Sequence, residues 1–436
     1  MAALRSRGRF GVSLGLARIE ALLGELGNPQ RQLRGALVGG TNGKGSVVAL
    51  ARAALQAAGL RIGTMPKPHL ASYRERIAID GEPISRERFA AALEAVMPAI
   101  DRVTARIGPP TEFEALTAAA FTELAGAGID LALVEVGLGG RLDATNVLDT
   151  GVAAITNVQH DHEKLLGPTL AAIGAEKAAI IKRRNLAVTG ARGRGLAPIL
   201  AHSTEVGASL RRAGPGQPYD AAVSDAGWDG LVIDAARPGG QLPSLRVGLL
   251  GGHQAANAAV ALALLDALAE DAARRGTPLN LDEAAIRRGF AAARWPGRLE
   301  LLRTTGIGPV LLDGAHNPAG ARALARALAE LGMRHFPLVF GATRGKRVTA
   351  VLRALAPLEP RPIFTRVDDP SALPAAELLN RWRRIGHRGG RTAATPDAAL
   401  RIAAELRQSA EQPVVVAGSL YLVGAARGML IGEVDA

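Results

Sequence analysis

The stretch Ala36-Leu37-Val38-Gly39-Gly40-Thr41-Asn42-Gly43-Lys44-Gly45-Ser46-Val47-Val48-Ala49 decides the fold. Its apolar start predicts a buried strand, its small residues predict a tight turn, and the apolar residues after Ser46 recur at helical spacing. A glycine turn between a strand and a helix lets backbone N–H groups approach phosphate oxygens, and the helix N-terminus adds partial positive charge. The segment therefore predicts a phosphate-binding loop.

Two side chains of this loop have the chemistry to hold a nucleotide. Lys44 can reach the β- and γ-phosphates, and Ser46 can bind Mg²⁺. The general nucleotide loop places Ser or Thr directly after the lysine, whereas Gly45 intervenes here. The alternative is a strand-to-helix turn of small residues with no ligand.

The composition is typical of a soluble globular protein. The chain has 436 residues, enough for two domains, with 48% hydrophobic and 21% charged residues. It has no cysteine, which excludes disulfides and Cys-based metal sites. No apolar run approaches the roughly 18 residues that span a membrane. No apolar segment follows Arg5, Arg7 and Arg9, so we expect no secretory signal, no membrane partner and a cytoplasmic location.

The formal net charge of +12 raises the question of a nucleic-acid partner. The charge is mainly arginine spread through predicted helices, and aromatic residues make up only 3% of the chain. We interpret it as compositional bias, with an acidic substrate as a second reason, and expect no nucleic acid. Lysine is scarce, yet Lys44 and Lys177 both lie inside motifs.

The rest of the pattern predicts an α/β protein with a domain boundary at Trp295-Pro296-Gly297. Residues 62–70 are predicted as a loop and residues 190–245 as a small β-rich insertion. A strand–helix rhythm after the boundary predicts a parallel sheet, with ligands beyond the carboxyl ends of its strands. The predicted helices are 13–27, 86–97, 111–127, 169–182, 254–270 and 282–293, and the predicted strands are 129–137, 152–158, 186–189, 310–313, 338–340, 363–367 and 414–416.

Several polar residues stand out against this pattern. Glu135 ends an apolar run, and a buried carboxylate needs a cation, which predicts a Mg²⁺ ligand or a partner for Arg141. His160 and His162 lack a third ligand at zinc spacing. Lys177 lies among alanines on a predicted helix, so it is either packed there or part of a solvated pair with Glu176.

The loop Gly40–Ser46 and the segment Val134–Asn146 resemble the Mur ligase superfamily, and most closely folylpolyglutamate synthase, often bifunctional with dihydrofolate synthase. The resemblance covers nearly the whole chain. It implies a P-loop-containing ATPase domain (1–296) with a parallel sheet and a small β-rich insertion. A smaller C-terminal Rossmann-like α/β domain (297–436) follows. The implied activity is ATP-dependent ligation of L-glutamate to the carboxylate of dihydropteroate or a folyl-glutamate, through an acyl phosphate, in a monomer.

The resemblance also assigns residues. It implies two Mg²⁺ ions, with Ser46, Glu135 and His162 as ligands. The role of His162 is implied because Asp161-His162 and Leu166-Gly167 match a family signature. Lys177 is implied to be carbamylated and to help position the second ion. Lys44, Lys177, Asp313 and His316 are the implied catalytic residues. The implied ATP site comprises Thr41, Asn42, Gly43, Lys44, Gly45, Ser46, Asn257, Arg298 and Asp313, although chemistry alone equally allows Asn257 to cap its helix.

A mobile loop near residues 64–77 is implied to cover the site, with Lys67, His69 and Arg76 binding substrate together with His316 and Ser419. Here the sequence departs from the family, because Lys67 replaces the usual serine before Pro68. This replacement puts the pterin-side specificity in question. The alternatives are a cell-wall Mur ligase acting on a UDP-sugar peptide and a nucleic-acid-binding P-loop protein. Pro68-His69-Leu70 and Leu26–Gln30 favour the folate branch.

Overall fold

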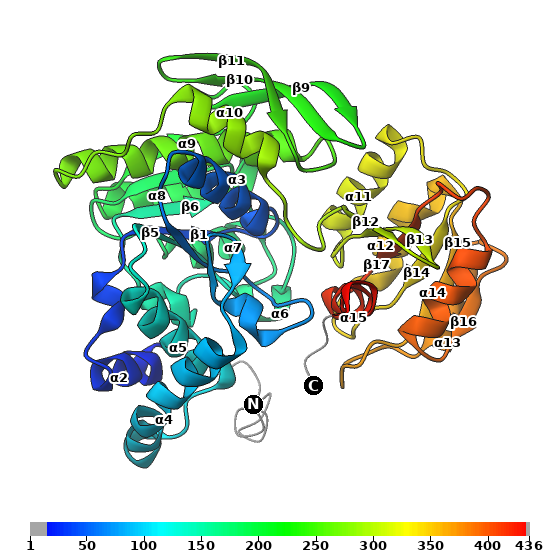
Figure 1. The fold of residues 1–436 in the computed structure, drawn as a ribbon, viewed down its shortest axis with the longest axis horizontal. Helices are drawn as coiled ribbons and strands as arrows, with labels where there is room; N and C mark the ends of the chain where they lie inside the picture. The colour runs from blue at the N-terminus through cyan, green and yellow to red at the C-terminus, as the bar shows by residue number, and fades with distance from the viewer. Residues whose placement is uncertain (1–14, 433–436) are drawn as a thin grey trace.

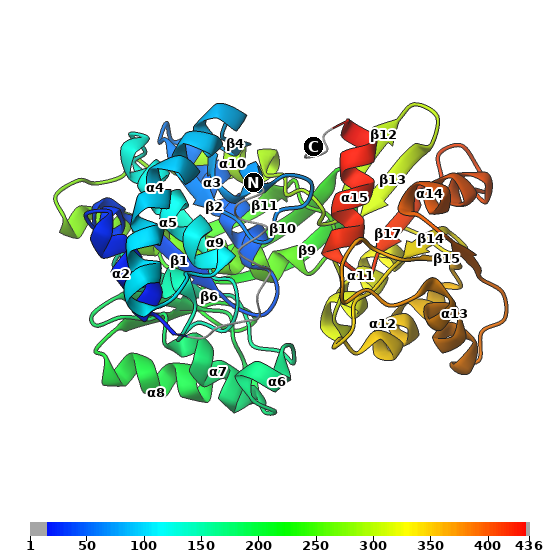
Figure 2. The same ribbon diagram turned by 90° about the horizontal axis from the view of Figure 1, so that it is seen from below.

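The computed structural model describes residues 15–432 as two α/β units side by side, each built on its own sheet (Figures 1 and 2). The first unit has an eight-stranded sheet in the order β4-β3-β2-β5-β1-β6-β7-β8, and the second a six-stranded sheet in the order β12-β13-β17-β14-β15-β16. The expected α/β architecture is confirmed. Arg5, Arg7, Arg9 and the first residues of the predicted helix 13–27 lie outside the described residues.

The first sheet is parallel through its centre, and the β2–β3 and β3–β4 pairs are antiparallel. Its strands are β1 (Gly35–Gly39), β2 (Ile62–Met65), β3 (Ala78–Ile79), β4 (Glu82–Pro83), β5 (Leu131–Glu135), β6 (Val152–Ile155), β7 (Leu186–Thr189) and β8 (Ser209–Arg212). The helices of this unit are α2 (Ala17–Glu25), α3 (Lys44–Ala57), α4 (Arg86–Ile107), α5 (Glu112–Gly126), α6 (Glu163–Leu166), α7 (Leu170–Ala178), α8 (Ala197–Glu205), α9 (Gln254–Arg274) and α10 (Glu283–Ala292).

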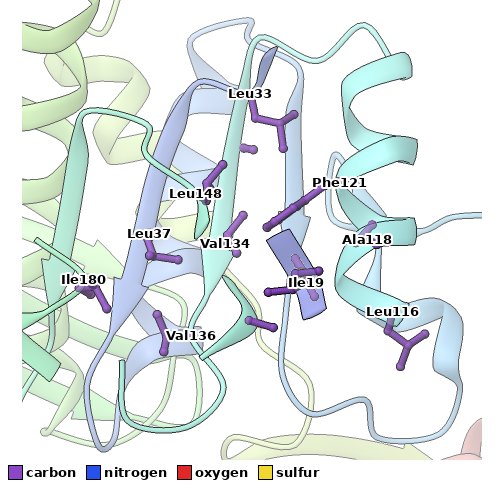
Figure 3. Packing of buried hydrophobic residues seen from close by; sticks show 14 of the residues in the cluster. Ile19, Leu33, Leu37, Leu116, Ala118, Phe121, Val134, Val136, Leu148 and Ile180 are labelled. Atoms are coloured by element: carbon purple, nitrogen blue, oxygen red, sulfur yellow. The ribbon is translucent and has the colours of Figure 1, made fainter. Parts of the chain in front are cut away.

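Alternation along β1 directs its side chains into two separate cores. Leu37 belongs to the core on one face, in which Phe121 of α5 and Ile19 of α2 also pack (Figure 3). Ala36 and Val38 face α3, α9 and α10 on the other. Because both faces are covered, β1 is buried along its whole length, as its continuous apolar run predicts.

A separate antiparallel sheet consists of β9 (Asp220–Gly227), β10 (Gly230–Arg237) and β11 (Gly240–Val247). The second unit contains β12 (Glu300–Thr304), β13 (Gly308–Leu312), β14 (Pro337–Phe340), β15 (Arg361–Thr365), β16 (Arg391–Ala393) and β17 (Val414–Ala417). Its helices are α11 (Pro318–Glu330), α12 (Val348–Leu355), α13 (Ala375–Arg384), α14 (Pro396–Glu405) and α15 (Leu420–Ile431). Helices α11, α12 and α13 cover one face of the sheet, and α14 and α15 cover the other.

Three predictions of secondary structure were wrong in part. Residues 62–65 form β2 instead of a loop, because they are buried and pair with β5, and the prolines begin only at Pro66. The helix predicted to end at 97 continues to Ile107 through Pro98, since Ile100 and Val103 still pack into the core. The segment 190–245 is not uniformly β-rich, because α8 precedes β8, and β8 extends the main sheet.

Smaller differences concern element ends. Helix α3 begins at Lys44 and not after Ser46, so the lysine lies in its first turn. Across residues 15–432, every helix is too short or too polar to serve as a membrane span.

Candidate active site

A cavity of about 400 Å³ lies where the carboxyl ends of the two sheets face each other. From the first sheet it receives the loop after β1, the end of β5 and the loop after β6. From the second it receives the segments after β13, β14 and β17. Side chains separated by hundreds of residues therefore meet at one place, as the rule for ligands in open α/β sheets predicts.

The loop after β1 is held open by backbone geometry that only glycine adopts easily. Gly43 precedes α3 with a φ of 81°, and a Cβ there would lie 2.3 Å from Oδ1 of Asn257. Among residues 15–432, no side chain caps the start of α3. The first N–H groups of the helix therefore belong to the surface on which an anion would be held.

Two lysines flank this loop. Nζ of Lys44 donates to the carbonyls of Gly40 at 3.2 Å and Thr41 at 3.3 Å. Nζ of Lys177, on α7, donates to the same Gly40 carbonyl at 3.0 Å. Burial, together with the charge of Lys44, lowers the pKa of Lys177 to about 7. Lys177 is therefore packed and does not form a solvated pair with Glu176, whose carboxylate instead binds Arg141.

Glu135 ends β5 inside the cavity and is 4% exposed. Its Oε1 lies 3.8 Å from Nζ of Lys44, and its Oε2 accepts the backbone N–H of Lys67 at 3.2 Å. Burial raises the pKa of Glu135 above its ordinary value, and Lys44 opposes that rise. Arg141, the alternative partner, is paired with Glu176.

The donors around Glu135 fit a magnesium ion that also binds phosphate. Buried Ser46 lies in the first turn of α3 and lines the same cavity. Within the described part of the chain, no three His, Asp or Glu side chains group closely enough to hold a metal alone. Mg²⁺ commonly binds one or two protein oxygens and takes its remaining ligands from phosphates and water.

The loop after β6 brings Asp161 and His162 to the cavity. Lys346, after β14, donates to Oδ1 of Asp161 at 2.8 Å and lies 3.3 Å from Nε2 of His162. Burial and the charge of Lys346 lower the pKa of His162 to about 4, so its ring is neutral at pH 7. Although burial opposes it, the bonds to His316 and Lys346 hold the pKa of Asp161 well below its usual range.

Asp313 follows β13 and organises the second unit's side of the cavity. Its oxygens accept the N–H groups of Leu299 at 3.0 Å and Ala315 at 2.9 Å. Burial raises its pKa, against the charge of Arg298. These two N–H groups belong to the residues next to Arg298 and His316, which both line the cavity. Asp313 therefore fixes the backbone that carries these two side chains.

The segment 66–77 forms another wall. Lys67 lines the cavity with its Nζ 2.8 Å from the centre of the Phe113 ring, and burial lowers its pKa to about 7. Arg76 also lines the cavity and donates from Nε to Nδ1 of His69 at 2.9 Å. The ring of His69 contacts that of Tyr73 at a tilt of 41° and is not part of the cavity lining.

The structure brings all the predicted site residues except His69 to this single cavity, including Asn257 and Ser419. The side chain of Asn257 lies against Gly43 of the loop after β1. Ser419 caps α15 by accepting the N–H of Tyr421 at 3.2 Å. Sequence reasoning missed the roles of Asp161, Lys346 and Asn317. A signal existed for Lys346, one of only six lysines, because it follows a predicted strand of a parallel sheet.

Comparison with known proteins places these features in one family. The family described as "Mur ligase middle domain" matches residues 38–265, and "Dihydrofolate synthetase, C-terminal domain" matches residues 300–427. The dihydrofolate synthase/folylpolyglutamate synthase of Bacillus subtilis is 33% identical, over 98% of this chain and 97% of its own. That of Mycobacterium tuberculosis is 37% identical, over 94% of this chain and 89% of its own.

This chain belongs to the dihydrofolate synthase/folylpolyglutamate synthase family. Solved structures of the family agree with the fold. The folylpolyglutamate synthase of Mycobacterium tuberculosis complexed with ADP has a TM-score of 0.89 at 36% identity, covering 98% of this chain and 97% of its own. A bifunctional folylpolyglutamate synthase/dihydrofolate synthase with Mn, AMPPNP and L-glutamate bound has a TM-score of 0.83 at 29% identity, covering 99% of this chain and 97% of its own.

Proposed function

We propose that this protein uses ATP to join L-glutamate to the carboxylate of dihydropteroate, a folyl-glutamate or both, acting in the cytoplasm as a monomer. The observation that carries the proposal is the shared cavity. One sheet supplies the phosphate loop, Lys44 and Glu135, and the other supplies Asp313, His316 and Ser419. Relatives crystallised with ADP, and with AMPPNP, Mn and L-glutamate, support the same ligands for this chain.

The reaction we propose has two steps. An oxygen of the acceptor carboxylate attacks the γ-phosphorus of ATP, the bond to the bridging oxygen breaks, and ADP leaves the acyl phosphate behind. The α-amino group of L-glutamate then attacks the acyl carbon, loses a proton, and phosphate departs as the amide forms. A protein nucleophile is not needed, so the work of the chain is to position reactants and to offset charge.

The cationic side chains of the cavity suit this work. Two anionic reactants must meet, and Lys44 with the loop N–H groups offsets the repulsion on the nucleotide side. We assign Asn257 to the adenine side and Arg298 to the phosphates. We assign Asp313 and His316 to the nucleotide and the incoming glutamate, and Ser419 to the glutamate site. Lys67 and Arg76 form the acceptor side, and His69 supports Arg76.

We assign one Mg²⁺ to Ser46 and Glu135, and a second to His162 with a carbamylated Lys177. A metal ion there would neutralise charge on the phosphate oxygens. Carbamylation requires a neutral amine, and the lowered pKa of Lys177 supports it. Neutral His162 has a ring nitrogen with a lone pair, which a metal ligand requires.

We place the domain boundary between residues 296 and 297, at the segment that joins α10 to β12. The two domains, 1–296 and 297–436, would close over the reactants and exclude water from the acyl phosphate.

The test is release of phosphate from ATP and Mg²⁺ in the presence of L-glutamate and one acceptor at a time. We expect glutamate-dependent release with dihydropteroate, tetrahydrofolate or both. Release only with a UDP-muramyl acceptor, or only with DNA or RNA, would overturn the proposal.

A further inference from the structure

Two loops of the second unit converge on the loop after β6 in the first. Asp161 accepts Nζ of Lys346 at 2.8 Å and Nδ2 of Asn317 at 3.0 Å, and Nε2 of His316 lies 3.4 Å away. Beside it, Arg347 donates to Glu163 at 2.8 Å. We call these six residues the inter-sheet clasp: Asp161, Glu163, His316, Asn317, Lys346 and Arg347.

Within the clasp, Lys346 also faces His162. Its Nζ lies 3.3 Å from Nε2 of His162, and its side chain is only 18% exposed. An ammonium group can only donate, so Nε2 must accept with its single lone pair. A metal ion needs that same lone pair. The two cations therefore cannot both use Nε2 of His162.

We propose that Lys346 is a tethered cation that competes with a metal ion for His162 and Asp161. The inference rests on the proposed function, in which His162 is a metal ligand. A metal ion that binds His162 must break the contact from Lys346, and that contact, while intact, lowers the affinity for the ion. By linkage the effect is reciprocal, so a metal ion at His162 weakens the hold of Lys346 on this loop.

Electrostatics act in the same direction as the lone pair. A cation that contacts the site repels a divalent ion strongly, because the surroundings are partly buried and water screens the charges poorly. Lys346 keeps a place in the cavity when it leaves His162, because Thr343 of the same loop also lines that cavity. Nucleotide phosphates can then accept from it, and the metal ion can take its former position.

The experiment titrates the full-length protein with Mn²⁺ alone, without nucleotide, and follows free Mn²⁺ by electron paramagnetic resonance. We expect Lys346→Met to tighten Mn²⁺ binding by about tenfold or more, because one repelling charge is removed. Arg347→Met is the matched control. This substitution removes a positive charge from the same loop. Because Arg347 pairs with Glu163 and lies outside the cavity lining, we expect Mn²⁺ affinity to change by less than about twofold.

The double variant Lys346→Met/His162→Ala should return Mn²⁺ affinity to the wild-type value. Unchanged or weaker binding in Lys346→Met, an equal gain in Arg347→Met, or a gain that survives the loss of His162 would each overturn the inference. Lys346→Gln gives a second neutral variant if Lys346→Met unfolds.

Phosphate release by the wild-type protein is measured in parallel. Absence of glutamate-dependent release with the Mn²⁺ effect intact contradicts only the proposed function. Normal release without the Mn²⁺ effect contradicts only the role of Lys346.

Discussion

The amine of Lys177 is buried beside the loop after β1, where it donates to the carbonyl of Gly40. Its pKa is lowered from 10.5 to about 7, so between these values the unfolded chain holds a proton that the folded chain has released. The free energy of unfolding therefore rises with pH across this window, and the cost of burying the charge is largest below about pH 7. Each unit by which the pKa differs between the two states is worth roughly 1.4 kcal/mol.

We therefore expect Lys177→Met to stabilise the protein at about pH 6.5 by roughly 1 kcal/mol or more, and much less at about pH 9.5. Urea unfolding in CO₂-free buffer measures both values. Lys164→Met, at an exposed position, is the control and should change neither. An equal effect of Lys177→Met at the two pH values contradicts the buried-charge explanation.

Gly43 permits a second prediction at the scale of one residue. Gly43→Ala adds a Cβ 2.3 Å from Oδ1 of Asn257, at a φ of 81°. We expect ADP binding, measured by calorimetry, to weaken by about tenfold or more, because the loop must shift. Gly59→Ala, after the same helix, has a φ of 87° and open space around it, so it imposes strain without collision. Equal losses in the two variants would show that the contact with Asn257 is irrelevant.

The sequence predicted the strand, glycine turn and helix around Lys44 well because the signals for them are local. Gly43, Lys44 and Ser46 lie within four consecutive positions, and their strand and helix follow from the flanking apolar spacing. The contacts of Asp161 could not be predicted in this way. They depend on Asn317 and Lys346, which approach only when a second sheet packs against the first.

Among the elements, the segment 66–77 is attached to the second unit through its backbone. A Cβ at Gly424 of α15 would lie 1.9 Å from the carbonyl oxygen of Leu70, and the Leu70 side chain packs on the core of α14 and α15. Glu75 holds the turn by accepting three backbone N–H groups, from Leu70, Ala71 and Ser72. The position of Lys67 and Arg76 therefore depends on α15.

We expect Gly424→Ala to raise the KM for the pterin acceptor by about tenfold and to leave ADP affinity nearly unchanged, because it displaces the segment but not the phosphate loop. Steady-state kinetics and calorimetry measure the two quantities. Gly24→Ala, inside α2 with open space around it, is the control. If ADP binding weakens while the acceptor KM stays constant, the segment does not serve the acceptor side.

Element types followed the sequence where apolar periodicity was strong. The errors arose where long-range pairing decided the outcome. Strand β2 is only four residues long and gains its partner from β5, nearly 70 positions away. Strand β12 was missed for a different reason, because it is only partly buried and is defined by a local antiparallel hairpin with β13.

For the whole molecule, the clasp links the two sheets by charge. Asp161→Asn removes the anion that Lys346, His316 and Asn317 share. The arrangement in which the two units pack together should therefore become less stable. We expect small-angle X-ray scattering to show a larger radius of gyration for this variant than for the wild type. Glu25→Gln, which removes a carboxylate paired with Arg102 and Arg106 inside one unit, should leave the radius unchanged. An unchanged radius in both variants would mean that apolar contacts alone keep the units closed.

The segment joining α10 to β12 places an indole directly against the start of α3. A Cβ at Gly45 would lie 2.5 Å from the ring of Trp295, and the chain has only two other tryptophans. Trp228 is on the β9–β10 turn, and Trp382 is buried in α13. With Trp228 and Trp382 replaced by phenylalanine, the intrinsic fluorescence of Trp295 should report nucleotide arrival in real time. The chain thus carries its own optical probe, and stopped-flow measurement needs no attached dye.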